Sequence, residues 1–526
     1  MDIKLRADKW VTNNKDIKIT DTDDGIKIEY FSDKPFEYIH YENIRVFSKY
    51  SHNDLFDIKE NSTYDINFIG YTEGNIEAYL FINTYSKESI LSNNSIILGS
   101  KKIIDTFKNT ISYKVAIRVS GKGCIYINKI NIDMLNKDYY FNKAKKEKNN
   151  EYLVLTNNYP SYADLYKNGF VHSRVRLYKE HGLDVDVYAL KPKGTSFYDY
   201  EFEGINVCTG DYTGLEFILK LNKYKKILIH FVNSEMIKVI NRCCKDTPLI
   251  IWLHGAEVSK WSGRKFNYTE QQIKLNQKKW DRADQTKMAF MRSIYQNNNY
   301  KFIVVSDWFR REVCEKDAEC KILNYEIIPN VVNSDIFKYK EKEPSDRLKI
   351  LSIRPYASNK YANDLTMKAI LELSNKPFFK ELEFSIYGKG DLFKTLTSQV
   401  EHFDNVKIYN SFLTHDEISK VHKEHGIFIC PTRLDSQGVS MCEAMSSGLV
   451  SISNDVSAIS EYLIDKECGI LAKENDYIGL ANAIEYLYYN QDEFLRMSKN
   501  ASTFIENKCG VKATISKEIK HIKGLV

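Results

Sequence analysis

The stretch Cys430-Pro-Thr-Arg-Leu-Asp-Ser-Gln-Gly-Val-Ser-Met-Cys-Glu-Ala-Met-Ser-Ser-Gly448 decides the fold class. An apolar run ends at Cys430, a polar loop with Gly438 follows, and a helical segment then carries Glu443 before a second apolar run, 449–452, begins. Strand, loop, helix and strand in this order are typical of a parallel sheet with helices on both faces.

The same succession of strands and helices continues over residues 151–510, in two cycles. A charged stretch with a proline, 338–347, separates them. The predicted strands of the first cycle are 151–155, 185–190, 226–231, 249–253 and 302–305, with a helix over 170–181, and those of the second are 348–353, 382–387, 406–409, 427–430 and 449–452. We therefore predict an α/β fold of two Rossmann-like doubly wound domains, 151–340 and 341–510, facing a cleft in which ligands bind at the carboxyl ends of the strands.

The first 150 residues have a different pattern. Short segments of alternating apolar and polar residues, separated by Asn, Asp, Ser and Gly, occur at 26–30, 64–68, 77–82, 113–119 and 125–132. This alternation predicts an antiparallel β-sandwich over 1–135. The polar and basic stretch 136–150 is predicted to be a linker, and 511–526 to be a tail helix that packs back on the first Rossmann-like domain.

Composition excludes several classes of protein. With 75 basic and 70 acidic residues, the net charge of +5 is small for 526 residues, and we expect no nucleic-acid partner. No apolar run is long enough to span a membrane and the charged first residues lack the apolar core of a signal peptide, so we expect a cytoplasmic protein. The ten cysteines form no Cys-x-x-Cys pair and no zinc spacing, which favours free thiols and no bound metal.

Two loops at predicted strand ends carry groups that suit an anionic, hydroxyl-rich ligand. Arg354 and Lys360 follow the strand 348–353 and can converge on one phosphate, although two solvated loop cations are the alternative. Gly438 lets backbone N–H groups approach a ligand at the start of a helix, where phosphate is favoured. Asp435 and Glu443 are placed to hold hydroxyl groups rather than metals; the alternative is that Asp435 or its neighbour Ser436 only caps the helix.

With these motifs the sequence resembles the retaining glycosyltransferases of family 4, which have the two-domain GT-B fold. Their hallmark is a pair of acidic residues separated by seven positions and followed by Ala-Met-x-x-Gly. Here the pair is Asp435 and Glu443, with Asp in place of the usual first Glu, and Ala444-Met445-Ser446-Ser447-Gly448 follows. Arg354 and Lys360 match the family's diphosphate-binding pair, although Tyr361 replaces the glycine that commonly follows the Lys.

The resemblance extends to other predicted strand ends. Further matches are Asn168-Gly169, His254-Gly255, Ser306-Asp-Trp308, Ile328-Pro-Asn-Val331, Tyr387-Gly-Lys-Gly390, Asn410-Ser-Phe-Leu413 and Glu461. The resemblance implies that Glu443 binds ribose hydroxyls and that Asp435 faces the transferred sugar. The implied catalytic residues are His254, Asp435, Arg354 and Lys360, and the implied donor-binding residues are Gly169, Gly388, Phe412, Ser436, Gln437, Gly438, Val439, Ser440 and Glu443.

The function implied by this resemblance is a retaining, metal-independent hexosyltransferase. It would move a sugar from a nucleotide-sugar, UDP- or GDP-linked, to a glycan, glycolipid or glycoprotein acceptor in the synthesis of cell-surface polysaccharides or glycoconjugates, with no further cofactor. One alternative is a catalytically degenerate GT-B protein that binds glycans or acts as a scaffold. Another is a different GT-B enzyme, such as a phosphorylase or a sugar-nucleotide epimerase.

Two regions bear on the acceptor and on partners. The segment 260–301 has ten basic and three acidic residues with aromatic residues between them, and in the family it lies on the acceptor side. It would meet an anionic lipid, a lipid-linked acceptor or a charged glycan at the inner membrane face, or it is a solvated helix pair with buried aromatics. Region 1–135 resembles a carbohydrate-binding module in strand rhythm, so it would hold the acceptor glycan or mediate oligomerisation, or serve as a scaffold.

Overall fold

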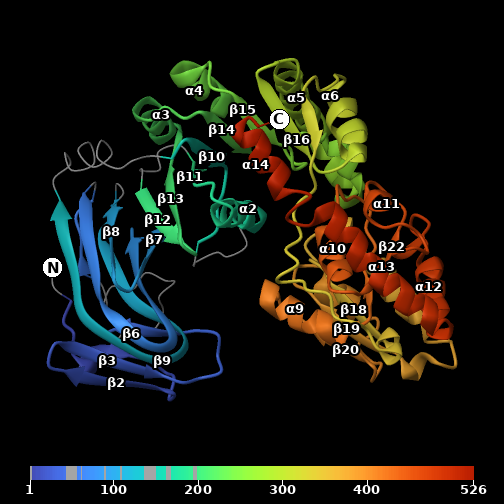
Figure 1. Cartoon of the computed structure of the whole chain (residues 1–526), viewed down its shortest axis with the longest axis horizontal. Coiled ribbons are helices and arrows are strands. Elements are labelled where there is room, and N and C mark those ends of the chain that lie inside the picture. Colours follow the sequence, from blue (N-terminus) through green and yellow to red (C-terminus); the bar gives the residue numbers. More distant parts are fainter. Residues whose placement is uncertain are drawn as a thin grey trace. The chain divides into compact units, whose positions relative to one another are not determined.

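The computed structural model describes residues 3–42, 56–60, 62–87, 90–106, 109–135, 150–161, 168–192 and 198–525 (Figure 1). They divide into two compact units, Met1–Pro248 and Leu249–Val526. The predicted linker 136–150 lies outside the described residues, except for Asn150. No helix in the described ranges is both long and apolar enough to cross a membrane.

The first unit begins with an antiparallel β region, as the sequence predicted. After a 3-10 turn at Ala7–Lys9 its strands are β1 Trp10–Val11, β2 Ile17–Thr22, β3 Gly25–Tyr30, β4 Glu37–Tyr41, β5 Phe56–Asp57, β6 Thr63–Tyr85, β7 Ile90–Ile97, β8 Ser100–Asp105 and β9 Ser112–Leu135. They are hydrogen-bonded in the order β1-β4-β9-β3-β2, while β6 pairs with β7, β8 and β9. Alternate side chains of these strands, including Ile28, Ile66, Leu80 and Ile117, are buried in one hydrophobic core.

Strands β6 and β9 are much longer than the alternating pattern predicted. The prediction of separate strands at 64–68 and 77–82, and at 113–119 and 125–132, is wrong, because β6 and β9 pair over their whole lengths, with one register shift between Ile69 and Gly70. Glycines explain the difference. Gly74 lies opposite Gly123. Gly121 has a φ of +90°, and a Cβ added to it would lie 2.1 Å from the Asn75 carbonyl oxygen. The glycines let both strands curve together, as Figure 1 shows, where the sequence analysis placed turns.

The rest of the first unit alternates strands and helices. Its elements are β10 Tyr152–Thr156, α2 Gly169–Glu180, β11 Asp186–Leu190, β12 Tyr198–Phe202, β13 Ile205–Gly210, α3 Tyr212–Leu221, β14 Lys226–His230 and α4 Ser234–Cys244. The strand order is β12-β13-β11-β10-β14, and β12 is antiparallel to β13. This hairpin is absent from the predicted strands. Its turn, Glu203 and Gly204, has positive φ at both positions (+46° and +76°), as a two-residue hairpin turn requires.

The second unit contains a short parallel set of strands and a complete doubly wound sheet. The first set is β15 Leu249–Trp252, β16 Tyr300–Val304 and β17 Tyr325–Ile327, with α5 Glu270–Tyr295 and α6 Lys316–Ala318 between them. The six-stranded sheet consists of β18 Lys349–Ile353, β19 Glu383–Tyr387, β20 Val406–Tyr409, β21 Ile427–Ile429, β22 Val450–Asn454 and β23 Gly469–Ala472. Its helices are α7 Asn363–Leu373, α8 Phe393–Thr397, α9 His415–Glu424, α10 Val439–Ser446, α11 Ile459–Tyr462, α12 Tyr477–Tyr489 and α13 Gln491–Cys509.

Helices cover both faces of this sheet, which confirms the predicted fold class. Ile350 and Ile427 point into a core shared with α7 and α12, whereas their neighbours Leu351 and Phe428 point into a core shared with α10 and α13. Such alternation follows from the two-residue period of a strand. The order β20-β19-β18-β21-β22-β23 places the crossover point between β18 and β21, where doubly wound sheets bind ligands at the carboxyl ends of the strands.

The C-terminal helix, α14 Ile515–Lys523, packs on the first strands of the second unit. The indole Nε1 of Trp252, on β15, donates to the Glu518 carboxylate at 3.1 Å. His521 Nε2 lies 3.5 Å from a carboxylate oxygen of Glu326, on β17. These contacts tie the tail of the chain to β15 and β17.

Candidate active site

The loops after β18 and β21 are joined by one buried guanidinium. Arg354 follows β18 directly and is only 4% exposed. Its Nη1 donates to Ser440 Oγ at 2.9 Å and its Nη2 to the Pro431 carbonyl oxygen at 3.5 Å. A cation that crosses between the two central strand ends of a doubly wound sheet lies where an anionic ligand is expected.

Tyr361, which departs from the family pattern, lies beneath both predicted phosphate-binding cations. The guanidinium carbon of Arg354 is 5.0 Å from the centre of the Tyr361 ring, and Lys360 Nζ is 5.6 Å from it. Both distances are in the range of cation–π attraction. The position of this ring is not among the predictions from the sequence, where Tyr361 is only the residue that replaces a glycine; an aromatic residue next to a functional lysine is the signal for it.

The segment that carries Lys360 is held against the 431–440 loop. Arg433 makes a two-pronged ion pair with Asp364, with both N–O distances at 2.8 Å. The backbone N–H of Arg433 and the Thr432 hydroxyl donate to the Lys360 carbonyl oxygen at 2.8 and 3.0 Å. Lys360 is therefore fixed in place by its backbone, which leaves its side chain available to a ligand.

Asp435 lies in this loop with its carboxylate bound to the backbone. Its Oδ1 accepts from the N–H groups of Gln437 and Gly438 at 3.3 and 3.0 Å. Burial alone would raise the pKa of Asp435, but the charges of Lys360 and Arg354 and these two N–H groups together lower it. The carboxylate thus binds backbone groups of its own loop just before α10 and also lies near the two cations, and its role toward a ligand stays a prediction.

Glu443 is in the opposite electrostatic situation. It is a half-buried residue in the first turns of α10, a helix whose other side chains are mostly buried and uncharged. Burial raises its pKa to about 8, and no described residue donates a hydrogen bond to its carboxyl group. A ligand hydroxyl would stabilise a carboxyl group in this environment, because it would supply the hydrogen bonds that the protein does not.

The helix that carries Glu443 begins and ends with glycines in left-handed backbone. Gly438, with φ of +77°, precedes Val439 and Ser440, whose N–H groups start α10. At the other end Gly448, with φ of +88°, donates to the Met445 carbonyl, and Leu449 donates to that of Ala444. The Ala-Met-x-x-Gly tail is therefore a helix stop.

Two contacts hold the 431–440 loop from the segments that follow β16 and β17, and a third joins α11 to the segment after β16. Ser306 Oγ donates to the Ser436 carbonyl at 2.8 Å. The buried Gln437 amide pairs with the backbone N–H and C=O of Asn330 at 2.7 and 3.0 Å, so its side chain supports the loop. Glu461 accepts from the backbone N–H groups of Asp307 and Trp308 at 3.0 and 2.6 Å. Four family landmarks thus meet in one place, which sequence spacing did not reveal.

The predicted glycine after β19 is needed for packing around Arg354. A Cβ on Gly388 would lie 2.2 Å from the Arg354 carbonyl oxygen and 2.6 Å from the Tyr356 ring. Phe412, in the loop after β20, is 49% exposed. Gly388 therefore positions the arginine loop, while the Phe412 ring is accessible to a ligand.

His254 and Gly169 come from other strand ends. His254 follows β15 and its backbone N–H donates to Glu257 Oε1. Burial raises the pKa of Glu257 to about 7, and its Oε2 has no hydrogen-bond partner among the described residues. Gly169 belongs to the first unit, where it starts α2 after β10, and a Cβ there would meet nothing within 4 Å. Their roles at the donor remain predictions.

The basic segment 260–301 reaches the loop that carries Lys360. Asn267 Oδ1 accepts from Ser358 Oγ at 2.7 Å, and Asn359 Nδ2 donates to the Phe266 carbonyl oxygen at 3.1 Å. Its aromatic residues pack on one another: the ring centres of Trp261 and Trp280 are 5.2 Å apart, and those of Tyr268 and Trp280 are 4.5 Å apart. In the ranges that the structure describes, no three His, Cys, Asp or Glu side chains group as metal ligands would.

Comparison with known proteins identifies the class of the second α/β region. Residues 333–504, about a third of the chain, match the family of glycosyl transferases group 1. This match contains Arg354, Lys360, Asp435 and Glu443. No curated protein sequence matches the chain.

Solved structures that resemble the chain include glycosyltransferases and a sucrose-phosphate synthase. Sucrose-phosphate synthase from Thermosynechococcus elongatus is 15% identical, with a TM-score of 0.53 over 71% of this chain and 99% of that one. Anabaena HepE in complex with UDP and glucose is 12% identical, with a TM-score of 0.52 over 72% of this chain and 100% of that one. The pneumococcal O-GlcNAc transferase GtfA in complex with UDP and GlcNAc is also 12% identical, with a TM-score of 0.51 over 72% and 99%.

At these identities the likeness shows the fold alone. The fold is GT-B, preceded by an antiparallel β region. Together with the family match, it establishes that the chain carries a glycosyltransferase domain of group 1. Donor, acceptor and stereochemistry lie beyond these comparisons.

Proposed function

We propose that the protein is a retaining glycosyltransferase that uses a nucleoside-diphosphate sugar, with a UDP-sugar as the first candidate. The observation that carries this proposal is the group formed by Arg354, Lys360 and the start of α10, with Asp435 and Glu443 beside it. HepE and GtfA, which share the fold, were solved with UDP and a sugar, and this supports UDP as the nucleotide.

In this proposal the cations stabilise the departing diphosphate. When the anomeric C–O bond breaks, negative charge develops on the phosphate oxygens, and Arg354, Lys360 and the N–H groups of Val439 and Ser440 would neutralise it. These groups are already fixed by Tyr361, Ser440 and the 431–440 loop, so little reorganisation accompanies the reaction. Asp435 would keep the two cations oriented and face the transferred sugar.

The first experiment is to measure nucleoside diphosphate release from a panel of UDP-, GDP-, ADP- and TDP-sugars. We expect selective, slow release by the wild type, and a fall in kcat of about 100–1,000-fold in Arg354→Ala, because one preorganised donor to the leaving group is lost. Arg496→Ala, which removes an exposed arginine on α13, is the matched control and should retain full activity.

The same samples test the alternative of a degenerate, glycan-binding GT-B protein. Each free nucleotide is added, and the thermal unfolding temperature is measured. Stabilisation by one nucleotide without release would leave a transferase that requires its acceptor. If the protein shows no release of nucleoside diphosphate and no stabilisation by any nucleotide, the result would contradict the proposed function.

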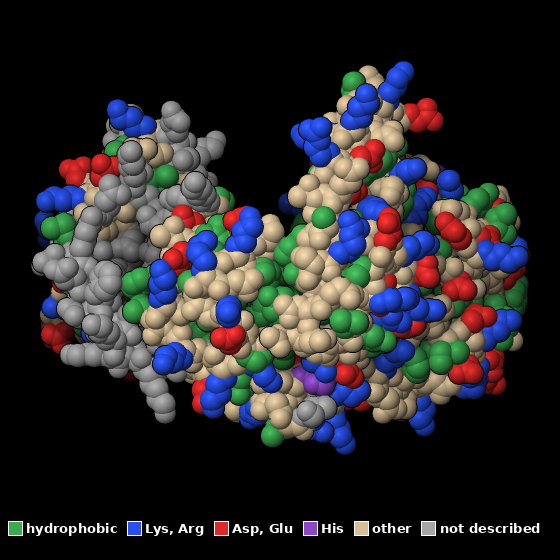
Figure 2. All heavy atoms as spheres, turned by 90° about the horizontal axis from the view of Figure 1, so that it is seen from above, with side chains coloured by type: hydrophobic (Ala, Val, Ile, Leu, Met, Phe, Trp, Pro, Cys, Tyr) green, Lys and Arg blue, Asp and Glu red, His purple; other side chains and the backbone are tan. Residues whose placement is uncertain are grey.

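For the acceptor we propose a lipid-linked or surface-bound glycan reached through the basic face of α5. Exposed Lys274, Lys278, Lys279 and Arg282 lie on this helix, and Leu275 is 75% exposed. Because the aromatic side chains of 260–301 pack on one another, contact with a membrane would be mainly electrostatic. Elsewhere, on the face that Figure 2 shows, basic and acidic side chains are interspersed.

A vesicle flotation assay tests this contact. We expect salt-sensitive binding to vesicles with anionic lipid, and at least a tenfold loss on changing Lys274, Lys278 and Lys279 to Glu, since each basic residue near such a surface is worth about 1 kcal/mol. A control changes Lys466, Lys473 and Lys499, which are exposed elsewhere in the second unit, to Glu. Equal loss in both triple variants, or no binding by the wild type, would exclude a specific membrane role for α5.

A further inference from the structure

A large cavity lies within the first unit, where the antiparallel β region meets the α/β sheet. Strand β12 lies against β7 and β8, so the cavity is lined from both sides, and its volume is about 660 Å³. Pockets that bind small ligands have volumes of about 300–1,000 Å³. The cavity is therefore large enough to hold a short oligosaccharide.

The cavity includes residues near the amino ends of the parallel strands of the first unit. Asn150 precedes β10, Asp184 and Asp186 lie at the start of β11, and Tyr224 precedes β14. Gly169, the predicted donor contact of this unit, follows the carboxyl end of β10 instead. Doubly wound domains bind their substrates at the carboxyl ends of strands, so the cavity is distinct from the edge at which this sheet would bind a donor.

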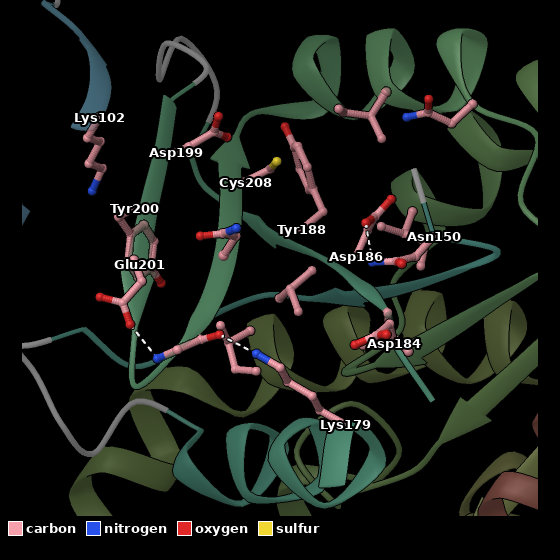
Figure 3. A pocket seen from close by; sticks show the side chains of 18 of the residues that line it. Lys102, Asn150, Lys179, Asp184, Asp186, Tyr188, Asp199, Tyr200, Glu201 and Cys208 are labelled. Carbon is pink, nitrogen blue, oxygen red and sulfur yellow. Dashed lines mark hydrogen bonds between the residues drawn. The ribbon is translucent and has the colours of Figure 1, made fainter. Parts of the chain in front are cut away.

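Charged and aromatic side chains of β8 and β12 lie next to each other on one side of this space. Figure 3 shows Lys102, from β8, directed toward Asp199, Tyr200 and Glu201 on β12. Lys102 Nζ donates to the Ser95 carbonyl oxygen at 3.1 Å and lies 5.7 Å from the centre of the Tyr200 ring. The ring and the polar groups together form one wall.

The polar groups on this wall are only partly satisfied by the protein. Glu201 Oε1 accepts from the Gly204 N–H, but Oε2 is buried and accepts from no described residue. Burial raises the pKa of Glu201 and lowers that of Lys102 to about 7. These groups have lost water without full replacement, so a ligand that brings hydrogen bonds would be stabilised there.

The opposite wall has the same mixed character. Asp186 accepts from Asn150 Nδ2 and from the Tyr224 hydroxyl, both at 2.9 Å, and burial still raises its pKa. In total, four carboxylates and three lysines line the cavity, so neither sign of charge dominates. A hydroxyl group both donates and accepts, and it can pair with either kind of group, whereas an acidic ligand would meet four carboxylates.

We propose that this cavity is a second glycan-binding site, which holds a neutral oligosaccharide between the antiparallel β region and the α/β sheet. The Tyr200 ring offers an apolar surface to a sugar face, while Glu201, Lys102 and Asp186 bind hydroxyl groups. The proposal does not depend on the transfer reaction, since it concerns a separate edge of the sheet. Its role would be to retain a glycan chain on the protein while the chain is extended elsewhere.

Calorimetric titration of the full chain with three trisaccharides tests the proposal. The probes are maltotriose and triacetylchitotriose, which are neutral, and trigalacturonic acid, which is acidic, all in the presence of saturating UDP. We expect at least one neutral probe to bind, and the acidic probe to bind more weakly or not at all. Failure of every probe, or a preference for the acidic one, would overturn the proposal.

Variants locate the binding within the chain. Glu201→Gln retains an acceptor for the Gly204 N–H but removes the anionic oxygen, and Lys102→Met retains the side-chain length without the charge. Each should weaken binding of the neutral trisaccharide about tenfold, because a charge-assisted hydrogen bond becomes a neutral one or is lost. Glu235→Gln, on α4 outside the cavity, should have no effect.

Binding of UDP by the same variants shows whether they are folded and whether the two sites are independent. We expect unchanged UDP affinity in Glu201→Gln and Lys102→Met. Trisaccharide binding that is unaffected by both variants would place the sugar at another site and overturn the proposal. We expect Arg354→Ala to lose UDP binding and still bind the trisaccharide, which would show that the cavity binds a glycan even when the transfer site has failed.

Discussion

The 431–440 loop of the second unit and the cavity of the first unit both hold acidic groups near cationic ones, but they leave them in different states. Asp435 has two nearby cations and two backbone N–H donors, and despite burial its pKa is lowered. Glu201 has one of each and two neighbouring acids, and burial raises its pKa. The number of compensating groups, and not burial alone, therefore decides whether a carboxylate remains charged.

The two regions also differ in what holds them. The loop is fixed by the bond from Ser306 to the Ser436 carbonyl and by the bonds of Gln437 to the Asn330 backbone, while Glu461 holds the neighbouring residues 307 and 308. In the cavity, by contrast, Glu201 Oε2 has no hydrogen-bond partner in the described ranges. The loop should therefore be sensitive to the loss of single hydrogen bonds, whereas the cavity should be sensitive to pH and to added ligand.

The largest effect is expected for Glu461→Ala. This change removes the acceptor of two backbone N–H groups, those of Asp307 and Trp308, and each hydrogen bond to a charged group contributes about 1.5–3 kcal/mol. We expect the free energy of unfolding of the second unit to fall by about 3–5 kcal/mol, measured by urea denaturation. Glu461→Gln should lose about half as much, and Glu467→Ala, at an exposed site, almost nothing. A loss below about 0.5 kcal/mol, typical of surface changes, would show that Glu461 does not hold the segment after β16 in place.

A smaller effect, with a pH dependence, is expected for Lys102→Met in the cavity. The pKa of Lys102 is lowered by burial from 10.5 to about 7, so between these values the unfolded chain holds a proton that the folded chain has released. The stability of the wild type should therefore rise with pH across this window, by about 2–4 kcal/mol relative to the variant. Urea denaturation at pH 7 and pH 10 measures the difference. A constant difference between the two proteins would mean that Lys102 is as well solvated as a surface lysine.

Much of the six-stranded sheet of the second unit could be predicted from the sequence, because its strand ends are marked by patterns of neighbouring residues. Apolar runs ending in Arg354 and in Cys430 mark strand ends, and parallel strands bring their carboxyl ends to one edge. That placed Arg354, Lys360, Asp435 and Glu443 in one region. The spacing could not show that Tyr361 lies beneath both cations, because ring orientation depends on the packing of the loop.

Contacts between residues far apart in the chain could not be predicted, because they produce no periodic pattern in the sequence. The pairing of Gln437 with Asn330 joins residues 107 apart, and the contact of Glu461 with Trp308 joins residues 153 apart. The cavity could not be predicted for the same reason, since Lys102 belongs to the antiparallel β region and Glu201 to the α/β sheet. In addition, the β12–β13 hairpin is not among the predicted strands. In β6 and β9 the glycines predict turns, because a single sequence does not show which residues of the neighbouring strand pair with them.

The smallest expected effect is at Glu443, where the 431–440 loop region most resembles the cavity. Its pKa is raised by burial from 4.5 to about 8, so between these values the folded chain holds a proton that the unfolded chain has released. Stability should fall as pH rises through this window, the reverse of Lys102, by about 1–3 kcal/mol because the site is partly open to solvent. Glu443→Gln should remove this slope.

Ligand binding distinguishes a functional Glu443 from a merely buried one. If ribose hydroxyls donate to its carboxylate, they favour the charged form, and UDP binding at pH 7 should release up to one proton. Calorimetry in two buffers of different ionisation enthalpy measures that release, with Glu443→Gln as the variant and Glu235→Gln as the control. Equal proton release by wild type and Glu443→Gln would mean that the raised pKa reflects burial in α10 alone, and that the nucleotide is held by the cations and the helix start.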